Sequence, residues 1–440
     1  MVRPLSRAIA LTASCCLMVL LAACDPFGSV VPGPTPIAST GSAPVTPTTG
    51  RATSTPTTAP MPATQTTCPT AGTARAAVFA PLALGYHQNI VYIFNTSGSA
   101  EIKRYDASTG KKVIIVNFPN INIDDAQISP DGKWILFTTP AGLAGAKALQ
   151  LVRMDGQGLQ TMYCSSLTSI EWSPDQKTVA FKDADQIGGG EIDLLDLATG
   201  HLQVVLAAPA ATVGSILVAS ASWLDNTHIY IASFVNGYKE PQGSLYELDI
   251  AKGAHQQVSD LIKIFDYTGY CLSFDSSVDN SKLFVSTCHS TGPGISPIQQ
   301  GPGTIIAEPA LGSSQTTVYT NPTLAITTVR VISNTTMLLL IQNLTGDTSH
   351  NGLWKMNLDG TGLIRLTTAG VGQMSSLNGT SQFTWSNISR DASMYAMEIS
   401  SNNNTTEALL IGSLESTSPS TFATVSRTVG NVAIVGWTTM

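Results

Sequence analysis

A turn-and-strand pattern that recurs 44 residues apart constrains the fold more than any other feature of the sequence. Residues 128–137 read ISPDGKWILF, and residues 172–181 read WSPDQKTVAF. In the first copy Pro130 presets φ for a tight turn, Asp131 can accept hydrogen bonds from its own backbone, and Gly132 tolerates positive φ. The apolar run that follows each turn is typical of a strand covered on both faces. A unit that recurs at this interval predicts a propeller or a solenoid.

The same unit of four strands can be traced through residues 85–440. Each unit has a half-apolar first strand, a polar turn, a continuous apolar second strand, and a hairpin of a third and fourth strand. Asp-Gly and Thr-Gly pairs, as at 155–156, 199–200 and 359–360, indicate the hairpins. We expect the second strands at residues 134–139, 178–182, 228–234, 283–288, 337–343 and 394–400.

Fragments of one further unit stand at the two ends of this region. Residues 432–437 look like a first strand, residues 90–94 like a second, and residues 101–106 and 112–118 like a third and fourth. Pairing of the C-terminal strand with the N-terminal strands would close a ring and leave no exposed strand edge at its seam. We therefore predict an all-β, seven-bladed propeller; an open β-sandwich or a six-bladed ring with extra strands are the alternatives.

The turn-and-strand unit resembles the TolB-like family of β-propeller repeats, which are relatives of the WD-repeat propellers. The resemblance is carried by SPDGK at 129–133, SPDQK at 173–177, RMDG at 153–156 and LDGTGLIRLT at 358–367. It implies the propeller fold and a periplasmic or extracellular location. It also implies a role as a protein-binding scaffold, as the propeller half of a peptidase, or as a ligand-binding domain.

The first 23 residues are expected to be a signal peptide rather than part of the fold. Arg3 and Arg7 precede an apolar segment that is shorter than the roughly 20 residues of a resident membrane helix. Residues 21–24 read LAAC, which resembles the bacterial lipobox and implies export, cleavage before Cys24 and lipidation of Cys24. We therefore expect a protein that is lipid-anchored at the cell membrane, on its extracellular or periplasmic side. An ordinary signal peptide or an uncleaved anchor is the alternative.

Residues 24–75 are predicted to be a disordered linker between the membrane anchor and the folded region. This segment is rich in Pro, Thr and Ser, and it has almost no charge and few large apolar residues. Such a chain cannot bury enough surface to offset the entropy lost on ordering. We expect it to act as a spacer that holds the propeller away from the membrane.

The net charge limits the kinds of partner that the protein can bind, and the cysteines indicate how it can be cross-linked. Without the signal peptide the formal charge is −9, so a nucleic-acid partner is not expected. Cys68, Cys164, Cys271 and Cys288 remain, and none of them forms a Cys-x-x-Cys motif. A short turn near residues 279–280 would place Cys271 opposite Cys288 in an antiparallel pair, which suits a disulfide. The alternative is that Cys271 and Cys288 are two buried free thiols. We expect the protein to be a monomer.

Motifs for catalysis are missing from the sequence, and we predict that the protein is not an enzyme. It contains no Gly-x-Ser-x-Gly, no His-Glu-x-x-His and no phosphate-binding loop. We expect no cofactor. A lactonase-like or other hydrolytic propeller is the alternative, with a calcium ion held near Asp124 and Asp125 at the entry to an innermost strand.

The longest loops between strands fall on one face of the predicted ring. They lie at residues 234–243, 287–303, 343–352 and 369–383, and they carry Tyr238, His289 and His350. Because binding residues are often carried by loops on a rigid scaffold, this face is the predicted binding surface for a protein or glycan partner. The leading prediction is a membrane-anchored, extracytoplasmic lipoprotein whose propeller is a non-catalytic binding scaffold.

Overall fold

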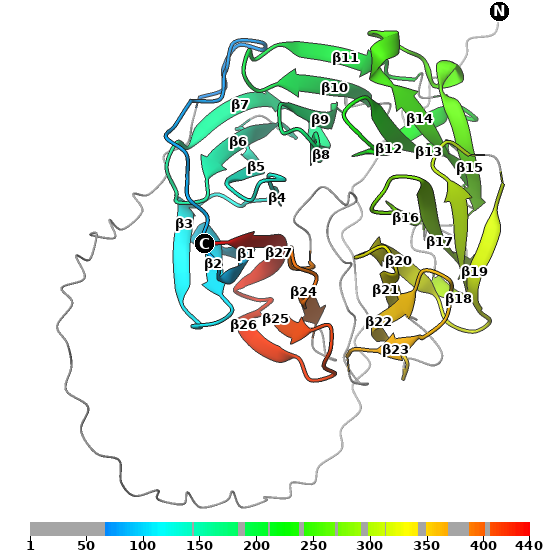
Figure 1. Ribbon diagram of the computed structural model, residues 1–440. Helices are drawn as coiled ribbons and strands as arrows, with labels where there is room; N and C mark the ends of the chain where they lie inside the picture. The colour runs from blue at the N-terminus through cyan, green and yellow to red at the C-terminus, as the bar shows by residue number, and fades with distance from the viewer. Residues whose placement is uncertain are drawn as a thin grey trace, which may run out of the picture. The chain divides into compact units, whose positions relative to one another are not determined.

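The computed structural model describes residues 67–440 apart from 143–144, 184–189, 210–211, 237–241, 269–271, 292–297, 313, 342–348, 368–386 and 401–404. Figure 1 shows seven antiparallel sheets arranged as the blades of a ring, and in the six four-stranded blades the first strand lies toward the centre. The predicted all-β class and seven-bladed propeller are therefore confirmed. None of the helical segments in the described residues has the length and hydropathy of a membrane span.

The strands are assigned to the blades in chain order. Blade 1 contains β27 (Gly430–Thr439), β1 (Gln88–Thr96), β2 (Ser99–Asp106) and β3 (Lys112–Pro119). Blade 2 contains β4 (Asp125–Ile128), β5 (Trp134–Pro140), β6 (Lys147–Arg153) and β7 (Gln160–Ser165). Blade 3 contains β8 (Leu167–Trp172), β9 (Thr178–Asp183), β10 (Glu191–Asp196) and β11 (Leu202–Leu206). Blade 4 contains β12 (Ile216–Trp223), β13 (His228–Val235), β14 (Gln242–Asp249) and β15 (Ile262–Thr268).

The remaining three blades follow the same order. Blade 5 contains β16 (Ser273–Ser276), β17 (Lys282–Thr291), β18 (Ile298–Pro309) and β19 (Thr316–Asn321). Blade 6 contains β20 (Ile326–Val331), β21 (Thr336–Ile341), β22 (Gly352–Asn357) and β23 (Ile364–Arg365). In blade 7 the described strands are β24 (Met394–Ser400), β25 (Thr406–Ser413) and β26 (Ser420–Ser426), and Ile388 forms an isolated bridge to Tyr395 on the inner side of β24.

The apolar second strand of each blade serves two interfaces at once. In β5, Ile135 and Phe137 pack against blade 1, whereas Leu136 packs against blade 3. In β21, Met337 packs toward blade 5 and Leu338 toward blade 7. Successive side chains of a strand point to opposite faces, so a strand between two neighbouring sheets needs apolar residues at every position. This explains the unbroken apolar runs in the sequence.

Hydrophobic clusters fill every interface around the ring. One cluster joins blades 7, 1 and 2, and separate clusters join blades 2 and 3, 3 and 4, 4 and 5, 5 and 6, and 6 and 7. The core is therefore distributed between the sheets rather than gathered at one point. The blades depend on one another for burial, as in other repeat architectures.

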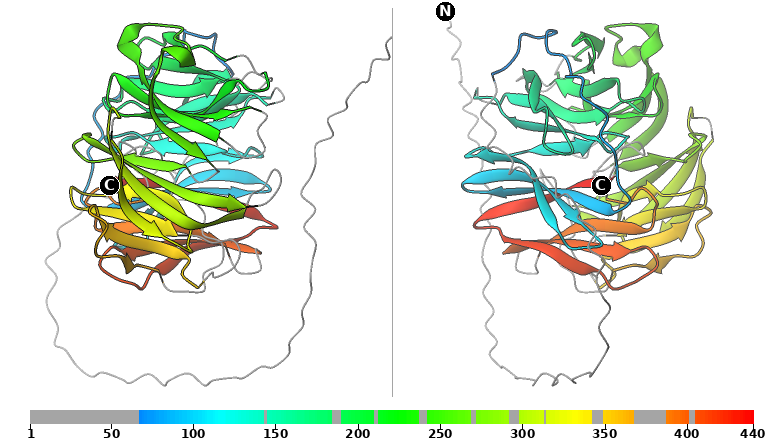
Figure 2. Two further views of the ribbon diagram at one scale, coloured as in Figure 1. Left: turned by 90° about the vertical axis from the view of Figure 1, so that its right-hand side faces the viewer. Right: turned by 60° about the vertical axis from the view of Figure 1, so that its left-hand side comes forward.

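The C-terminal strand closes the ring. β27 runs antiparallel to β1, and Trp437 faces Ile90 in the register. Figures 1 and 2 show the red β27 beside the blue β1 in blade 1. Trp437 is fully buried, and its indole Nε1 donates to the carbonyl of Asn387 near blade 7 at 2.8 Å. The predicted circular closure is confirmed.

The recurring Ser-x-Asp turn is held by its own side chains. Ser129 Oγ donates to Asp131 Oδ1 at 2.7 Å, and Asp131 Oδ1 accepts from the backbone N–H of Lys133 at 3.0 Å. Gly132 has φ +75°, as the sequence predicts, but Gln176 takes the equivalent place in blade 3 with φ +64°. The aspartate therefore defines this turn more strictly than the glycine does.

These turns define two faces of the ring. We call the side that carries the first-to-second and third-to-fourth connections the turn face, and the opposite side the loop face. The loop face therefore carries the second-to-third connections and the connections from one blade to the next.

Residues 68–86, here called the strap, lie against blades 3, 2 and 1 without forming a strand of their own (Figure 2, right). Cys68 forms a disulfide with Cys164 of β7, 96 residues away in the chain. The backbone N–H of Ala76 donates to the carbonyl of Leu197 in blade 3 at 2.7 Å. The last residues of the predicted linker 24–75 are thus attached to the ring; residues 24–66 lie outside the described part.

The second half of the strap packs on blade 2 and then reaches blade 1, where β27 pairs with β1. The ring of Phe79 lies 5.7 Å from that of Trp134, and the Arg153 guanidinium lies over Phe79 at 5.1 Å. Arg153 Nη1 also donates to the carbonyl of Ala80 at 2.8 Å. The N–H of Gly85 donates to the carbonyl of Thr439 at 3.1 Å, so the strap ends beside the paired termini.

Candidate functional site: inner strands and turn face

The innermost strands of blades 3 and 4 are joined by side chains of β8. Glu171 Oε2 accepts from the backbone N–H of Trp223 at 3.1 Å, and Ser169 Oγ accepts from the N–H of Ala221 at 3.0 Å. The inner edge of a blade has backbone groups that no fifth strand pairs with, and a buried N–H needs an acceptor. Glu171 and Ser169 supply these acceptors from the neighbouring blade.

Blades 5 and 6 repeat this arrangement with a different carboxylate. Asp275 Oδ2 accepts from the N–H of Val331 at 2.8 Å, and Ser273 Oγ accepts from the N–H of Val329 at 3.2 Å. Asp275 Oδ1 also lies 3.6 Å from Arg330 Nη1, and both side chains are almost fully buried. The repeated geometry identifies Glu171 and Asp275 as connectors between inner strands.

Burial perturbs the acids of these inner strands. Burial raises the pKa of Glu171 to about 8; the hydrogen bond from Trp223 and the charge of Arg330 act in the opposite direction, and the charge of Asp125 adds to the rise. The pKa of Asp275 is also raised by burial, against the lowering effect of Arg330. Perturbed carboxyl groups are common at functional sites, but structural networks perturb them as well.

Sequence reasoning missed Glu171, Asp275 and the Cys68–Cys164 disulfide. Glu171 and Asp275 each lie two residues before the serine of a Ser-x-Asp turn, Ser173 or Ser277. Aligning the repeats on that serine would have placed two acids at one position of an otherwise apolar strand. The disulfide gave no comparable signal, because Cys68 stands in a segment with the composition of a linker.

The metal site proposed at Asp124 and Asp125 stays a prediction. Asp124 is exposed and pairs with Lys147, with Oδ2 and Nζ 3.5 Å apart. Asp125 is accessible at the inner strand β4, yet enough protein surrounds it to raise its pKa. No group of three His, Cys, Asp or Glu side chains with metal-binding geometry occurs in the part of the chain that the structure describes.

Of the three binding residues predicted on the loop face, the structure describes the side chain of His350. His350 is exposed on the connection before β22, with Nδ1 3.0 Å from Ser349 Oγ. His289 belongs to β17, and its side chain is outside the described part. Tyr238 and Cys24 lie outside the described residues, so the loop-face hypothesis and the lipidation of Cys24 stay predictions.

The predicted Cys271–Cys288 pair is described on one side only. Cys288 takes part in a disulfide, whereas Cys271 lies outside the described residues. Ser273 faces Ser286 across β16 and β17, which is the register assumed for the prediction. The connection is longer than the two-residue loop that was expected, because β16 ends at Ser276 and β17 begins at Lys282. The pairing itself stays a prediction.

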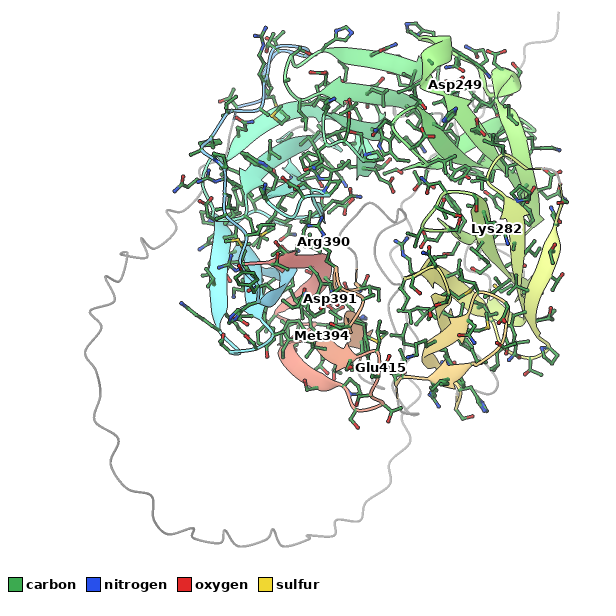
Figure 3. All side chains as sticks on the ribbon, viewed as in Figure 1. Asp249, Lys282, Arg390, Asp391, Met394 and Glu415 are labelled. Carbon is green, nitrogen blue, oxygen red and sulfur yellow. A yellow bond between two sulfur atoms is a disulfide. The ribbon has the colours of Figure 1, made fainter. Side chains whose placement is uncertain are left out.

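Two hollows flank the turn-face end of blade 5. The larger, of about 790 Å³, lies toward blade 6 between the start of β17, the start of β19 and the turn at 358–359. The smaller, of about 620 Å³, lies toward blade 4 beside Ile262 and Leu311. Glu308, near the end of β18, lines both hollows and is only 4% exposed. Figure 3 labels Lys282 at the start of β17, which also lines the larger hollow.

Next to the smaller hollow is a polar cluster on β13 and β14. His228 Nδ1 lies 2.9 Å from Asp225 Oδ2, and its Nε2 lies 3.7 Å from Oε1 of the buried Glu247. Burial lowers the pKa of His228, but the hydrogen bond to Asp225 and the charges of Asp225 and Glu247 outweigh this effect and raise it. The Tyr230 hydroxyl donates to the carbonyl of Ala310 at 2.9 Å, linking this cluster to blade 5.

Comparisons with known proteins agree with the fold. No protein-family model matches the chain, and no curated protein matches it significantly. A prolyl endopeptidase structure is 13% identical with a TM-score of 0.52, over 80% of this chain and 51% of that one. The β-propeller domain of the Trilobed protease from Pyrococcus furiosus is 10% identical with a TM-score of 0.51, over 76% of this chain and 94% of that domain.

TolB from Acinetobacter baumannii is also similar, at 14% identity and a TM-score of 0.42, over 79% of this chain and 82% of that chain. The chain spans about half the length of the prolyl endopeptidase. Likeness at these identities shows the fold alone. The fold of this chain is the seven-bladed β-propeller that its resemblance to TolB-like repeats implies.

Proposed function

We propose that this chain is a lipid-anchored, extracytoplasmic protein whose propeller acts as a non-catalytic scaffold for binding a partner. The observation that carries the proposal is the Cys68–Cys164 disulfide. Disulfides persist in oxidising compartments outside the cytosol and are rare within it. Cys68 follows the Pro/Thr-rich segment, so the disulfide attaches the propeller to the end of a spacer that begins at the predicted lipidated Cys24.

The binding role is supported by the surface of the ring. The turn face has two hollows at blade 5, whereas buried side chains close the interfaces between the blades. A rigid ring that presents hollows between short connections is suited to holding a partner, because its backbone loses little freedom on binding. The peptidase likenesses concern fold alone and add no catalytic residue to this chain.

Lipidation is tested by metabolic labelling with an alkyne fatty acid followed by membrane fractionation. The wild-type protein is expected to carry the label and to sediment with membranes, and Cys24→Ser is expected to lose both properties. Cys16→Ser, which alters the predicted signal peptide, is the matched control and is expected to retain both. Label retained in Cys24→Ser, or a soluble wild-type protein, contradicts the proposal.

The scaffold role is tested by chemical crosslinking of the tagged protein in intact cells. We expect one reproducible partner with the wild-type protein, and no partner at all would oppose the scaffold role. Calcium analysis of the purified protein addresses the hydrolytic alternative. Stoichiometric calcium that is lost in an Asp124→Asn, Asp125→Asn variant would favour a metal-dependent hydrolase instead.

A further inference from the structure

We propose that the two hollows at blade 5 bind an extended peptide segment of a partner protein, with a Lys or Arg side chain directed at Glu308 and apolar side chains on either side of it. This inference deepens the proposed binding role and rests on it. It names the surface, the kind of partner and the residues that select it.

The two hollows form one surface around a hairpin of blade 5. The hollows lie on the two sides of the β18–β19 hairpin, and Glu308 lines both of them. Leu311 at the tip of this hairpin is 59% exposed, and Ile262 across the smaller hollow is 44% exposed. An extended segment that crosses the hairpin would cover these two side chains.

The larger hollow has an acidic lining. Asp279, Glu308 and Asp359 line it, and among the described lining residues Lys282 is the one cation. Hydrogen bonds from the Ser277 and Ser281 side chains lower the pKa of Asp279 to about 2, and those from Thr361 lower the pKa of Asp359. Asp279 and Asp359 are therefore ionised at neutral pH, and the hollow favours a cation over an anion.

A second buried acid lies close to Glu308. Glu247 of blade 4 is 4% exposed, and its Oε2 has no hydrogen-bond partner in the part of the chain that the structure describes. Burial raises the pKa of Tyr230, and the charges of Glu247 and Glu308 add to the rise, so both carboxyl groups lie near the Tyr230 side chain. In the smaller hollow, Lys263 is already paired with Asp266 at 2.8 Å. Acidic side chains of blades 4 and 5 therefore lie near each other beneath this surface.

The experiment uses the mature protein and short fluorescent peptides that differ only in a central residue, placed between valines: Arg, Lys, Gln or Glu. Fluorescence anisotropy measures each affinity at low and high salt. The Arg and Lys peptides are expected to bind at least about 10-fold more tightly than the Gln and Glu peptides. Their affinity is expected to decrease as the salt concentration rises. Equal affinity for the Glu peptide, or no binding of the Arg peptide up to about 1 mM, overturns the proposal.

Variants locate the binding to this surface. Glu308→Gln replaces the carboxyl group by an amide of the same shape, and Leu311→Ser removes an exposed apolar contact. Each substitution is expected to weaken binding of the Arg peptide at least about 10-fold. Two matched controls lie away from this surface: Glu415→Gln changes a carboxylate on blade 7 (Figure 3), and Val429→Ser changes an exposed apolar side chain on the loop face. Both control variants are expected to bind the Arg peptide as the wild type does. Normal binding by both test variants overturns the proposal.

Two further outcomes separate this inference from its alternatives. If the wild-type protein self-associates and Leu311→Ser abolishes this, the surface is an interface between two copies and the peptide proposal is wrong. If Glu308→Gln and Leu311→Ser together leave crosslinking to the cellular partner intact, the surface assignment fails while the scaffold role stands. Loss of that crosslink in the variants, but not in the controls, supports both.

Discussion

Replacing Glu171 by glutamine is expected to stabilise the protein strongly near pH 8 and only slightly near pH 5. Glu171 is 2% exposed, and burial raises its pKa from 4.5 to about 8. Between these values the folded protein retains a proton that the unfolded chain has lost. Stability therefore decreases as pH rises through this window and is unaffected by Glu171 below it.

The size of the effect follows from the shift. Each pKa unit corresponds to about 1.4 kcal/mol, so the wild-type protein loses on the order of 5 kcal/mol between pH 4.5 and pH 8 through this one group. Glutamine cannot ionise, and its amide oxygen can still accept the hydrogen bond from Trp223. The variant should thus gain about 3–5 kcal/mol over wild type near pH 8 and less than about 1 kcal/mol near pH 5.

Urea unfolding followed by circular dichroism at several pH values measures this difference. Glu415→Gln, whose side chain is 84% exposed, is the matched control and is expected to follow the wild-type pH profile. A stability gain that does not change with pH would contradict the reasoning. A Glu171→Gln protein that is less stable than wild type near pH 8 would show that the buried carboxyl is ionised and needed in that form.

Replacing Cys68 and Cys164 by serine is expected to lower the free energy of unfolding by about 2–4 kcal/mol, since the disulfide joins residues 96 apart; urea unfolding that matches the oxidised wild type would contradict this. Trp437→Ala is expected to cost about 3–5 kcal/mol because the indole is fully buried at the closure, and a measured loss below about 1 kcal/mol would refute its role. An NMR titration should give His228 a pKa above that of an ordinary histidine, and Asp225→Asn should bring it down; an unchanged value would disprove the pairing.

The fold could be predicted from sequence because its determinants are local and repeated. The apolar runs of β5 and β21 reflect strands covered on both faces, and the Asp131 turn carries its own hydrogen-bond acceptors. Circular closure followed from the incomplete units at the two ends. These features depend on a residue and its near neighbours, which a sequence displays directly.

The attachments between distant segments could not be predicted in the same way. The Cys68–Cys164 disulfide and the contact of Phe79 with Trp134 join a segment of linker-like composition to blade 2. The hollows beside Glu308 depend on how three blades meet at the turn face, and the short connections there gave no sign of them. The long connections that the sequence does display lie on the opposite face.

The disulfide of the strap has a mechanical consequence. A force that pulls on the chain before Cys68 is transmitted through the disulfide to Cys164, which lies on β7, the outermost strand of blade 2. The hydrogen-bonded seam between β1 and β27 begins about 20 residues further along, at Gln88, and is shielded from that load. A pulling force on the N-terminus would therefore reorient the whole propeller before it could separate β1 from β27.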